Sequence, residues 1–185
     1  THGQQAIPIT FGYKAAVWAS ELRRDIERME DCRKRCFVGQ LSGAVGSMAG
    51  FGENGREISR RVIEALDLDV PDISWHVSRD RLAEIVSVLA TLGCTFGKIG
   101  QEIVYLQGTE TGEAAEGFVH GAVGSSTMPH KRNPVAPEAL QTLSRLAKAG
   151  MGATFDSMYQ FHERDGASWK IEWMSVNETV MLVGG

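Results

Sequence analysis

The sequence has little of what marks the more specialised protein classes. Three of its 185 residues are cysteines, Cys32, Cys36 and Cys94, too few for a disulfide framework. A reducing, cytoplasmic setting is therefore expected. The formal net charge of -4 argues against a strongly basic nucleic-acid binder. Charged residues or glycines interrupt the long apolar stretches, so no membrane span is expected.

No stretch alternates apolar and polar residues convincingly, so no β-sheet is expected. Hydrophobic residues make up 43% of the chain and charged residues 23%, which is typical of a globular protein and not of a disordered one. A chain of this length buries a sizeable core without metals or disulfides. One all-α domain over residues 1–185 is the resulting expectation.

Apolar residues at steps of three and four predict four helices. Residues 13–37 form a long amphipathic helix whose apolar stripe includes Cys32 and Cys36, and residues 56–66 form a short one. Ser78 is expected to cap a rod of about 28 residues that carries the apolar positions Leu82 to Leu106. Residues 135–159 form the last predicted helix. The rod is apolar on several flanks, which predicts contacts on more than one side and a place inside an oligomer.

Two glycine-rich segments lie between these helices. The run from Gly50 to Gly55 matches the dinucleotide-binding glycine pattern in form, but that pattern needs a preceding strand, and residues 41–49 do not read as one. Residues 107–134 form a long loop, and loops of that length between helices are usually functional or mobile.

The long loop contains the densest polar run in the chain, Gly124-Ser-Ser-Thr-Met-Pro-His-Lys-Arg-Asn-Pro134, followed by Glu138. Hydroxyls, backbone donors, cationic groups and an amide at this density are typical of an anion-binding pocket. A polar surface loop would have a similar composition, and composition alone does not separate the two readings.

This run resembles the characteristic loop of the fumarase/aspartase superfamily at every fixed position of that family's pattern. Two further stretches agree with it: Thr1-His-Gly-Gln4 resembles the family's Thr-His-Gly region, and His162-Glu-Arg-Asp165 resembles a stretch of the adenylosuccinate lyase branch. The resemblance implies a long-helix bundle that forms the core of a homotetramer with shared active sites. Family members are longer, so we expect a central helical-bundle domain without an N-terminal part and a C-terminal domain.

The resemblance also implies a chemistry: abstraction of a proton next to a carboxylate, followed by expulsion of the group on the neighbouring carbon. Ser125 is the expected general base, with Ser126 as the alternative. A free serine is too weak an acid for this role, so cationic groups and oriented donors must lower its pKa. Lys131 and backbone N–H groups of the loop are the available donors. Lys131 and Asn133 are expected to bind the substrate carboxylate.

Other site residues follow from the same resemblance. His2 is expected to be the general acid toward the leaving group, oriented by Glu138, because a neighbouring carboxylate raises the pKa of an imidazole and fixes its tautomer. Thr1, Ser126 and Met128 are expected substrate contacts, and Arg164 is expected to bind an anionic group. His120 and His130 lack a metal-ligand spacing, so neither a metal nor a cofactor is predicted.

Two branches of the family remain open as the function. Adenylosuccinate lyases carry a phosphate-binding serine five residues after the arginine of the His-Glu-Arg-Asp stretch, and Trp169 stands there in this chain. That replacement, together with Trp75-His76, resembles 3-carboxy-cis,cis-muconate cycloisomerases of aromatic degradation, so a small polycarboxylate substrate is expected. Adenylosuccinate lyase or another fumarate-releasing lyase is the alternative, and a non-catalytic structural relative is a third possibility.

Overall fold

The computed structural model describes residues 1–117, 121 and 124–185 of the chain. Within them every regular element is helical, and the only β-contact is an isolated bridge between Val38 and Asp69. The elements are α1 (Phe11–Cys36), the short 3-10 helix η1 (Ala49–Phe51), α2 (Gly55–Ala65), α3 (Asp80–Gln107), α4 (Val135–Asp156) and α5 (Gly166–Gly184). The expected all-α class is confirmed, and no strand precedes the glycine run from Gly50 to Gly55.

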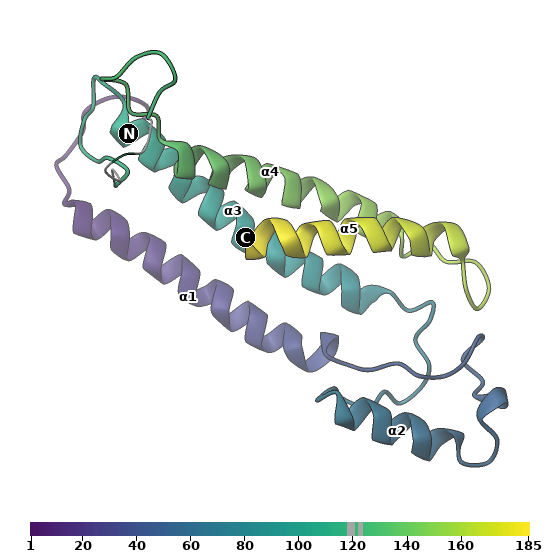
Figure 1. The fold of residues 1–185 in the computed structure, drawn as a ribbon. Helices are drawn as coiled ribbons and strands as arrows, with labels where there is room; N and C mark the ends of the chain where they lie inside the picture. Colours follow the sequence, from purple (N-terminus) through teal and green to yellow (C-terminus); the bar gives the residue numbers. More distant parts are fainter. Residues whose placement is uncertain (118–120, 122–123) are drawn as a thin grey trace.

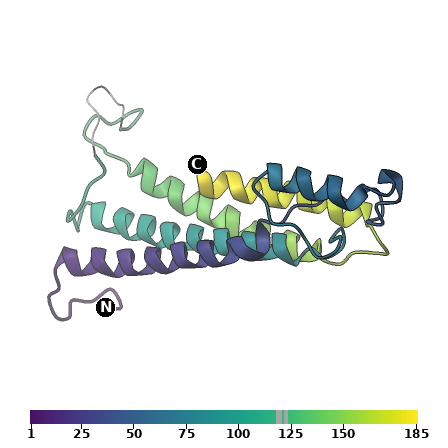
Figure 2. The same ribbon diagram turned by 90° about the horizontal axis from the view of Figure 1, so that it is seen from below.

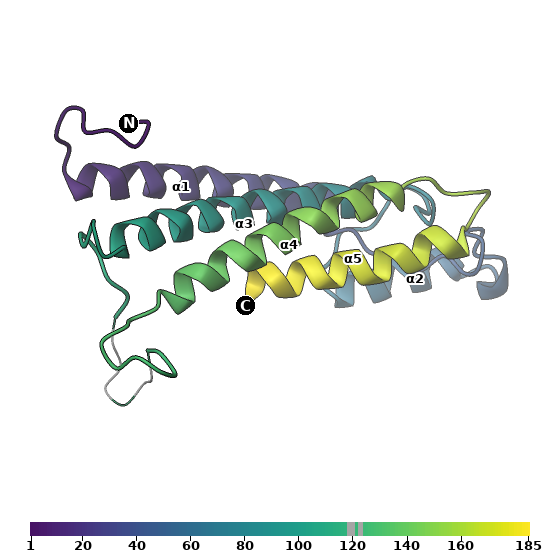
Figure 3. The same cartoon turned by 90° about the horizontal axis from the view of Figure 1, so that it is seen from above.

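The long helices α1, α3, α4 and α5 run lengthwise beside one another, and α2 lies near one end of them (Figure 1). Figures 2 and 3 show the N-terminal segment and the connection between α3 and α4 at the opposite end. We call the end with residues 1–10, 108–117 and 124–134 the loop end of the bundle. The end with residues 66–79 and 157–165 is the turn end.

Helix α3 is the centre of the bundle, because it packs against α1, α4 and α5. The predicted contact on more than one side is therefore confirmed. By length and composition α3 is also apolar enough to cross a membrane, contrary to the expectation drawn from interrupted apolar stretches. Packing against three neighbours requires small or apolar residues around most of a helix, and a core helix meets the same two criteria as a membrane span.

Glycines in α3 let α4 approach its backbone closely. A Cβ atom added to Gly100 would lie 2.7 Å from the carbonyl oxygen of Pro137 and 3.0 Å from the Cβ of Leu140. A Cβ atom on Gly97 would lie 2.4 Å from the Oγ of Ser144. The glycines cost helix propensity in α3, and the close packing of α4 against them offsets this cost.

Polar side chains cap the N-terminal ends of α1 and α5. The Thr10 hydroxyl accepts from the Tyr13 N–H at the start of α1, and the Asp165 carboxylate accepts from two N–H groups at the start of α5. Ser78 does not cap α3, so that expectation is wrong. Arg79 occupies the N-cap position, and its guanidinium makes two contacts of 2.6 Å with the buried Glu172 carboxylate of α5.

Helix α5 was not predicted from the sequence, because apolar residues occur all around it. Its buried face is polar or small and consists of Ser168, Glu172, Ser175 and Thr179. Large apolar side chains instead face outward, among them Trp173, Met174 and Met181. This reversal leaves an exposed apolar surface on the bundle.

The glycine contact between α3 and α4 makes a testable prediction. Replacing Gly100 with Ala overpacks the contact with Pro137, and the free energy of unfolding should fall by about 1–3 kcal/mol. Gly152, within α4, has open space around its Cα, so Gly152→Ala is the matched control and should stabilise by about 0.5–1 kcal/mol. Urea unfolding of both variants tests the contact, and equal stabilisation by the two substitutions would contradict it.

Candidate active site

Residues 124–133 of the Gly-Ser-Ser loop fold back on themselves at the loop end. A Cβ atom on Gly124 would lie 2.9 Å from the carbonyl oxygen of Lys131, so the start and the end of the loop are in contact. The Met128 N–H donates to the Oγ of Ser125 at 3.3 Å, and the Lys131 N–H donates to the carbonyl of Met128 at 3.0 Å. Ser125 and Asn133 are half-buried, and the other expected contact residues of the loop, Ser126, Met128 and Lys131, are exposed.

The hydrogen bond to Ser125 has a direct electrostatic meaning. A backbone N–H that points at a hydroxyl oxygen stabilises negative charge on that oxygen, which favours the deprotonated form. The ammonium of Lys131 makes no hydrogen bond or ion pair within the described part of the chain. The expected backbone donor is therefore in place at Ser125, and a direct contact from Lys131 stays a prediction.

Two residues that the sequence did not single out anchor the loop to the bundle. Gln107, the last residue of α3, donates from Nε2 to the carbonyl of Arg132 at 3.1 Å and accepts from the N–H of Glu116 at 2.7 Å. The Glu116 carboxylate in turn accepts from the N–H of Ala136 in the first turn of α4. These bonds join residues that are 9 to 25 positions apart, so no local sequence pattern predicts them.

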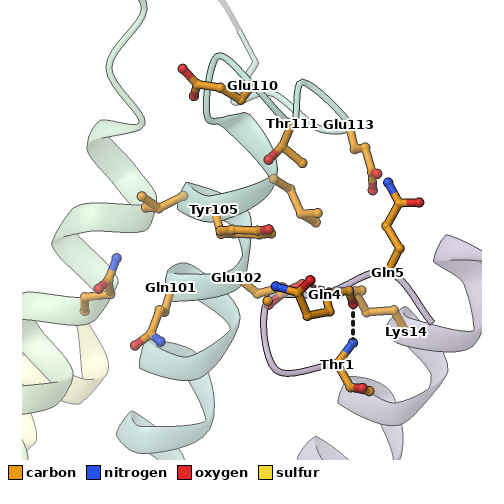
Figure 4. Close-up of a pocket in the computed structure, with 14 residues that line it drawn as sticks. Thr1, Gln4, Gln5, Lys14, Gln101, Glu102, Tyr105, Glu110, Thr111 and Glu113 are labelled. Atoms are coloured by element: carbon orange, nitrogen blue, oxygen red, sulfur yellow. Dashed lines mark hydrogen bonds and ion pairs between the residues drawn. The ribbon is translucent and has the colours of Figure 1, made fainter.

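The N-terminal segment forms one wall of a cavity of about 980 Å³ at the same end (Figure 4). Thr1, Gln4 and Gln5 face the last turns of α3 and the residues that follow it, including Tyr105 and Glu110. Across the floor of this cavity, Lys14 of α1 forms an ion pair with Glu102 of α3. Thr1 thus lines a polar cavity, and its contact with the substrate stays a prediction.

His2 and Glu138 are both exposed near the loop end. His2 has a φ of +53°, which places its backbone in the left-handed region, and Glu138 lies in the first turn of α4. Within residues 1–117, 121 and 124–185, neither a hydrogen bond nor an ion pair joins the two side chains. The orientation of His2 by Glu138 stays a prediction.

Arg164 lies at the turn end, far from the other expected site residues. Between Asn133 and Arg164 stands the whole of α4, whose 22 residues span about 33 Å. The guanidinium of Arg164 stacks on the indole of Trp169, 4.8 Å from the ring centre, and its Nη2 lies 3.1 Å from the Nε2 of His76. The chain alone therefore does not bring Arg164 together with Ser125.

A second cavity, of about 280 Å³, surrounds Arg164 and is called here the tryptophan cavity. It is lined by Gln40, Trp75, His76, Arg79, Gln160, Arg164 and Trp169. Burial, followed by the positive charges of Arg164 and Arg79, lowers the pKa of His76 from its ordinary value of 6.5. His76 is therefore neutral at pH 7. Both arginines contact an indole face, which gives the cavity an aromatic and cationic lining.

The cysteines and histidines form no metal centre in the part of the chain that the structure describes, which contains no group of three or more His, Cys, Asp or Glu side chains suited to an ion. Cys32 is a buried residue of α1, and burial raises the pKa of the Cys36 thiol to about 12. Both are packing residues, as the helical stripe predicted. His120 lies outside the described residues.

Comparison with known proteins agrees with the sequence motifs. A family model described as "Lyase" matches residues 1–147. The chain is 47% identical to N-acetyl-S-(2-succino)cysteine lyase of Enterococcus italicus over 96% of its own length and 39% of that protein. It is 46% identical to adenylosuccinate lyase of Methanocaldococcus jannaschii, over 89% of this chain and 36% of that protein.

A solved structure gives the same result at the level of the fold. The 3-carboxy-cis,cis-muconate lactonizing enzyme of Pseudomonas putida superposes with a TM-score of 0.88 at 37% identity, over 99% of this chain and 40% of that one. The chain thus spans about two fifths of the length of these relatives. With the family model matched over residues 1–147 and the helical fold shared, the chain belongs to the fumarase/aspartase superfamily of lyases.

Proposed function

We propose that the full-length protein containing this chain is a fumarate-releasing lyase that cleaves N-acetyl-S-(2-succino)cysteine or a close thioether analogue. The observation that carries the proposal is the tryptophan cavity, where Arg164 has the indole of Trp169 and the imidazole of His76 as neighbours. Adenylosuccinate lyases carry a phosphate-binding serine at the position of Trp169. Identities of 47% and 45% to two lyases of that name support it. The sequence-based preference for a cycloisomerase becomes the second candidate.

The reaction breaks the bond between sulfur and the succinyl carbon. Ser125 removes a proton from the carbon next to a carboxylate, and the electron pair moves into that carboxylate. The pair then forms the double bond of fumarate while the thiolate leaves, and His2 supplies the proton that the leaving group takes up. Lys131 and Asn133 stabilise the negative charge that accumulates on the carboxylate before the thiolate departs.

Ser125 is favoured over Ser126 as the base because of its hydrogen bond. Ser125 is half-buried and its Oγ accepts from the Met128 N–H, whereas Ser126 is exposed. Donation from the backbone lowers the cost of an alkoxide without adding a mobile charge. Gln107 and Glu116 hold the loop in the shape that makes this bond.

The leaving-group carboxylate is assigned to Arg164. A guanidinium binds a carboxylate through a fork of two parallel N–H donors. The indole of Trp169 fixes the plane of this fork. Trp169 also fills the position of the serine that would help to hold a nucleotide phosphate. A substrate with three carboxylates and no phosphate therefore suits this chain better than adenylosuccinate.

A 3-carboxy-cis,cis-muconate cycloisomerase is the second candidate, because its substrate likewise carries three carboxylates. The TM-score of 0.88 with the Pseudomonas putida enzyme and the 40% identity to the Acinetobacter baylyi cycloisomerase favour it. In that case an internal carboxylate adds to a double bond to give a lactone, which is the reverse of the same elimination.

A homotetramer with shared active sites is part of the proposal. A single small substrate does not reach across the 22 residues of α4, so Ser125 and Arg164 serve one substrate only if different chains supply them. The outward apolar face of α5, with Trp173, Met174 and Met181, offers a surface for such contact. Cyclic or dihedral symmetry then repeats the site at equivalent places.

A substrate panel tests the proposed reaction. The full-length protein should release fumarate from N-acetyl-S-(2-succino)cysteine and turn over adenylosuccinate far more slowly, both followed by ultraviolet absorbance. Ser125→Ala should lower kcat by at least about 100-fold, because general base catalysis contributes 10²–10⁴-fold. Ser20→Ala, on the exposed face of α1, is the control and should leave kcat unchanged. Turnover of the muconate alone would favour the second candidate, and ligand binding without any turnover would point to a structural relative.

The role of Trp169 makes a separate prediction. Trp169→Ser removes the stacking partner of Arg164, and loss of a cation–π contact of about 0.5–1 kcal/mol raises KM about two- to fivefold. Because one hydroxyl does not rebuild a phosphate site, the variant should not gain adenylosuccinate cleavage. Steady-state kinetics on both substrates measure this. A gain of adenylosuccinate cleavage would assign the chain to the nucleotide branch instead.

Mixing two inactive variants tests the shared site. Ser125→Ala and Arg164→Ala proteins, unfolded together and refolded, should regain about a quarter of the wild-type activity at substrate concentrations below KM, because a quarter of randomly mixed sites receive both native residues. Each variant refolded alone is the control. Absence of any regain would mean that the two residues do not meet at one site between chains.

A further inference from the structure

Hydrogen-bond chemistry fixes the state of His76 in the tryptophan cavity. A guanidinium has donors only, so the 3.1 Å contact with Nη2 of Arg164 requires the Nε2 of His76 to be the acceptor. The ring proton then lies on Nδ1. This atom is buried and finds no hydrogen-bond partner among the described residues. Such an unpaired donor costs free energy, and buried polar groups without partners are rare enough to need an explanation.

The two arginines of the cavity differ in how their charge is matched. Arg79 makes two contacts of 2.6 Å with the Glu172 carboxylate, and both side chains are buried, so its charge is compensated inside the protein. For Arg164 the described part of the chain offers no carboxylate within ion-pair distance. Its partners are the neutral ring of His76 and the face of Trp169. Arg164 thus keeps its full charge for an anion from outside.

A histidine suits this place for a physical reason. A carboxylate at position 76 would pair with the guanidinium and occupy the fork that the ligand needs. A neutral imidazole takes one N–H, fixes the orientation of the fork and leaves the charge uncompensated. Arg164 and Arg79 face the ring, and with burial they oppose its protonation, while Glu172 is held by Arg79.

The contact also spans two distant parts of the chain. His76 lies in the segment before α3, and Arg164 lies 88 residues later in the segment before α5. We propose that His76 is a positioning residue, which holds Arg164 for the carboxylate of the leaving group without neutralising it. This inference rests on the proposed function, since it takes from there that Arg164 binds the leaving group.

Product inhibition of the full-length protein tests the role of His76. N-acetylcysteine is the probe for the Arg164 side of the site, and fumarate is the probe for the Gly-Ser-Ser loop. Loss of the acceptor in His76→Leu should raise the inhibition constant of N-acetylcysteine about three- to tenfold, the effect of one hydrogen bond to a charged group. The inhibition constant of fumarate and kcat should stay within about twofold of wild type.

Two further variants separate positioning from a merely structural role. His76→Gln places an amide oxygen within reach of Arg164 and should restore most of the affinity for N-acetylcysteine. In an Arg164→Ala background, His76→Leu should have no additional effect, because the two residues act as one unit. Arg61→Ala, on the exposed face of α2, is the control for a lost surface arginine. An unchanged N-acetylcysteine constant in His76→Leu, equal rises for both products, or additive effects with Arg164→Ala would overturn the proposal.

A measurement independent of turnover distinguishes failure of this inference from failure of the proposed function. Nitrogen-15 chemical shifts of His76 should report a proton on Nδ1 and a bare Nε2 in the wild-type protein. In the Arg164→Ala protein the ring should lose this fixed tautomer. Unchanged shifts in Arg164→Ala would overturn the positioning role even if the enzyme cleaves the thioether. The expected shifts in a protein that turns over none of the substrates would uphold the contact and reject the reaction.

Discussion

The close approach of α4 to α3 is the constraint on which the rest of the structure depends. Gly97 and Gly100 remove the side chains that would separate the two backbones, so the start of α4 lies directly against the end of α3. Gln107 and Glu116 can then bridge the long loop to both helices. The geometry of the Gly-Ser-Ser loop is thus set by a helix contact that lies outside the loop itself.

The same contact determines which chemistry lies at each end of the bundle. Because α4 runs straight from the loop end to the turn end, the groups before it and after it are separated by the length of the helix. The residues that we propose for proton transfer are at one end, and the aromatic and cationic cavity is at the other. Each end holds part of a site, and the apolar outer face of α5 is the surface through which copies of the chain complete it in our proposal.

Charge is distributed unequally within the tryptophan cavity. Arg79 fixes α3 to α5 through Glu172 and so belongs to the scaffold, whereas Arg164 is held by an imidazole and an indole. Removing an arginine from solvent without an anion is costly, so Arg164 stays exposed. A scaffold arginine and the arginine that we propose to bind the ligand therefore line the same cavity, and they differ in their partners and in their exposure.

The sequence by itself determined the class of fold, four of the five α-helices to within a few residues, and the family, since helical periodicity and the motif from Gly124 to Asn133 are local signals. It also indicated Ser125, Lys131 and Asn133 as one group, because a short loop keeps them together. Tertiary structure alone decided that α5 turns its polar face inward, that Arg79 and not Ser78 takes the N-cap position of α3, and that Arg164 is paired with His76. These features depend on contacts between residues dozens of positions apart, and no local pattern encodes which distant side chain supplies a missing charge or acceptor.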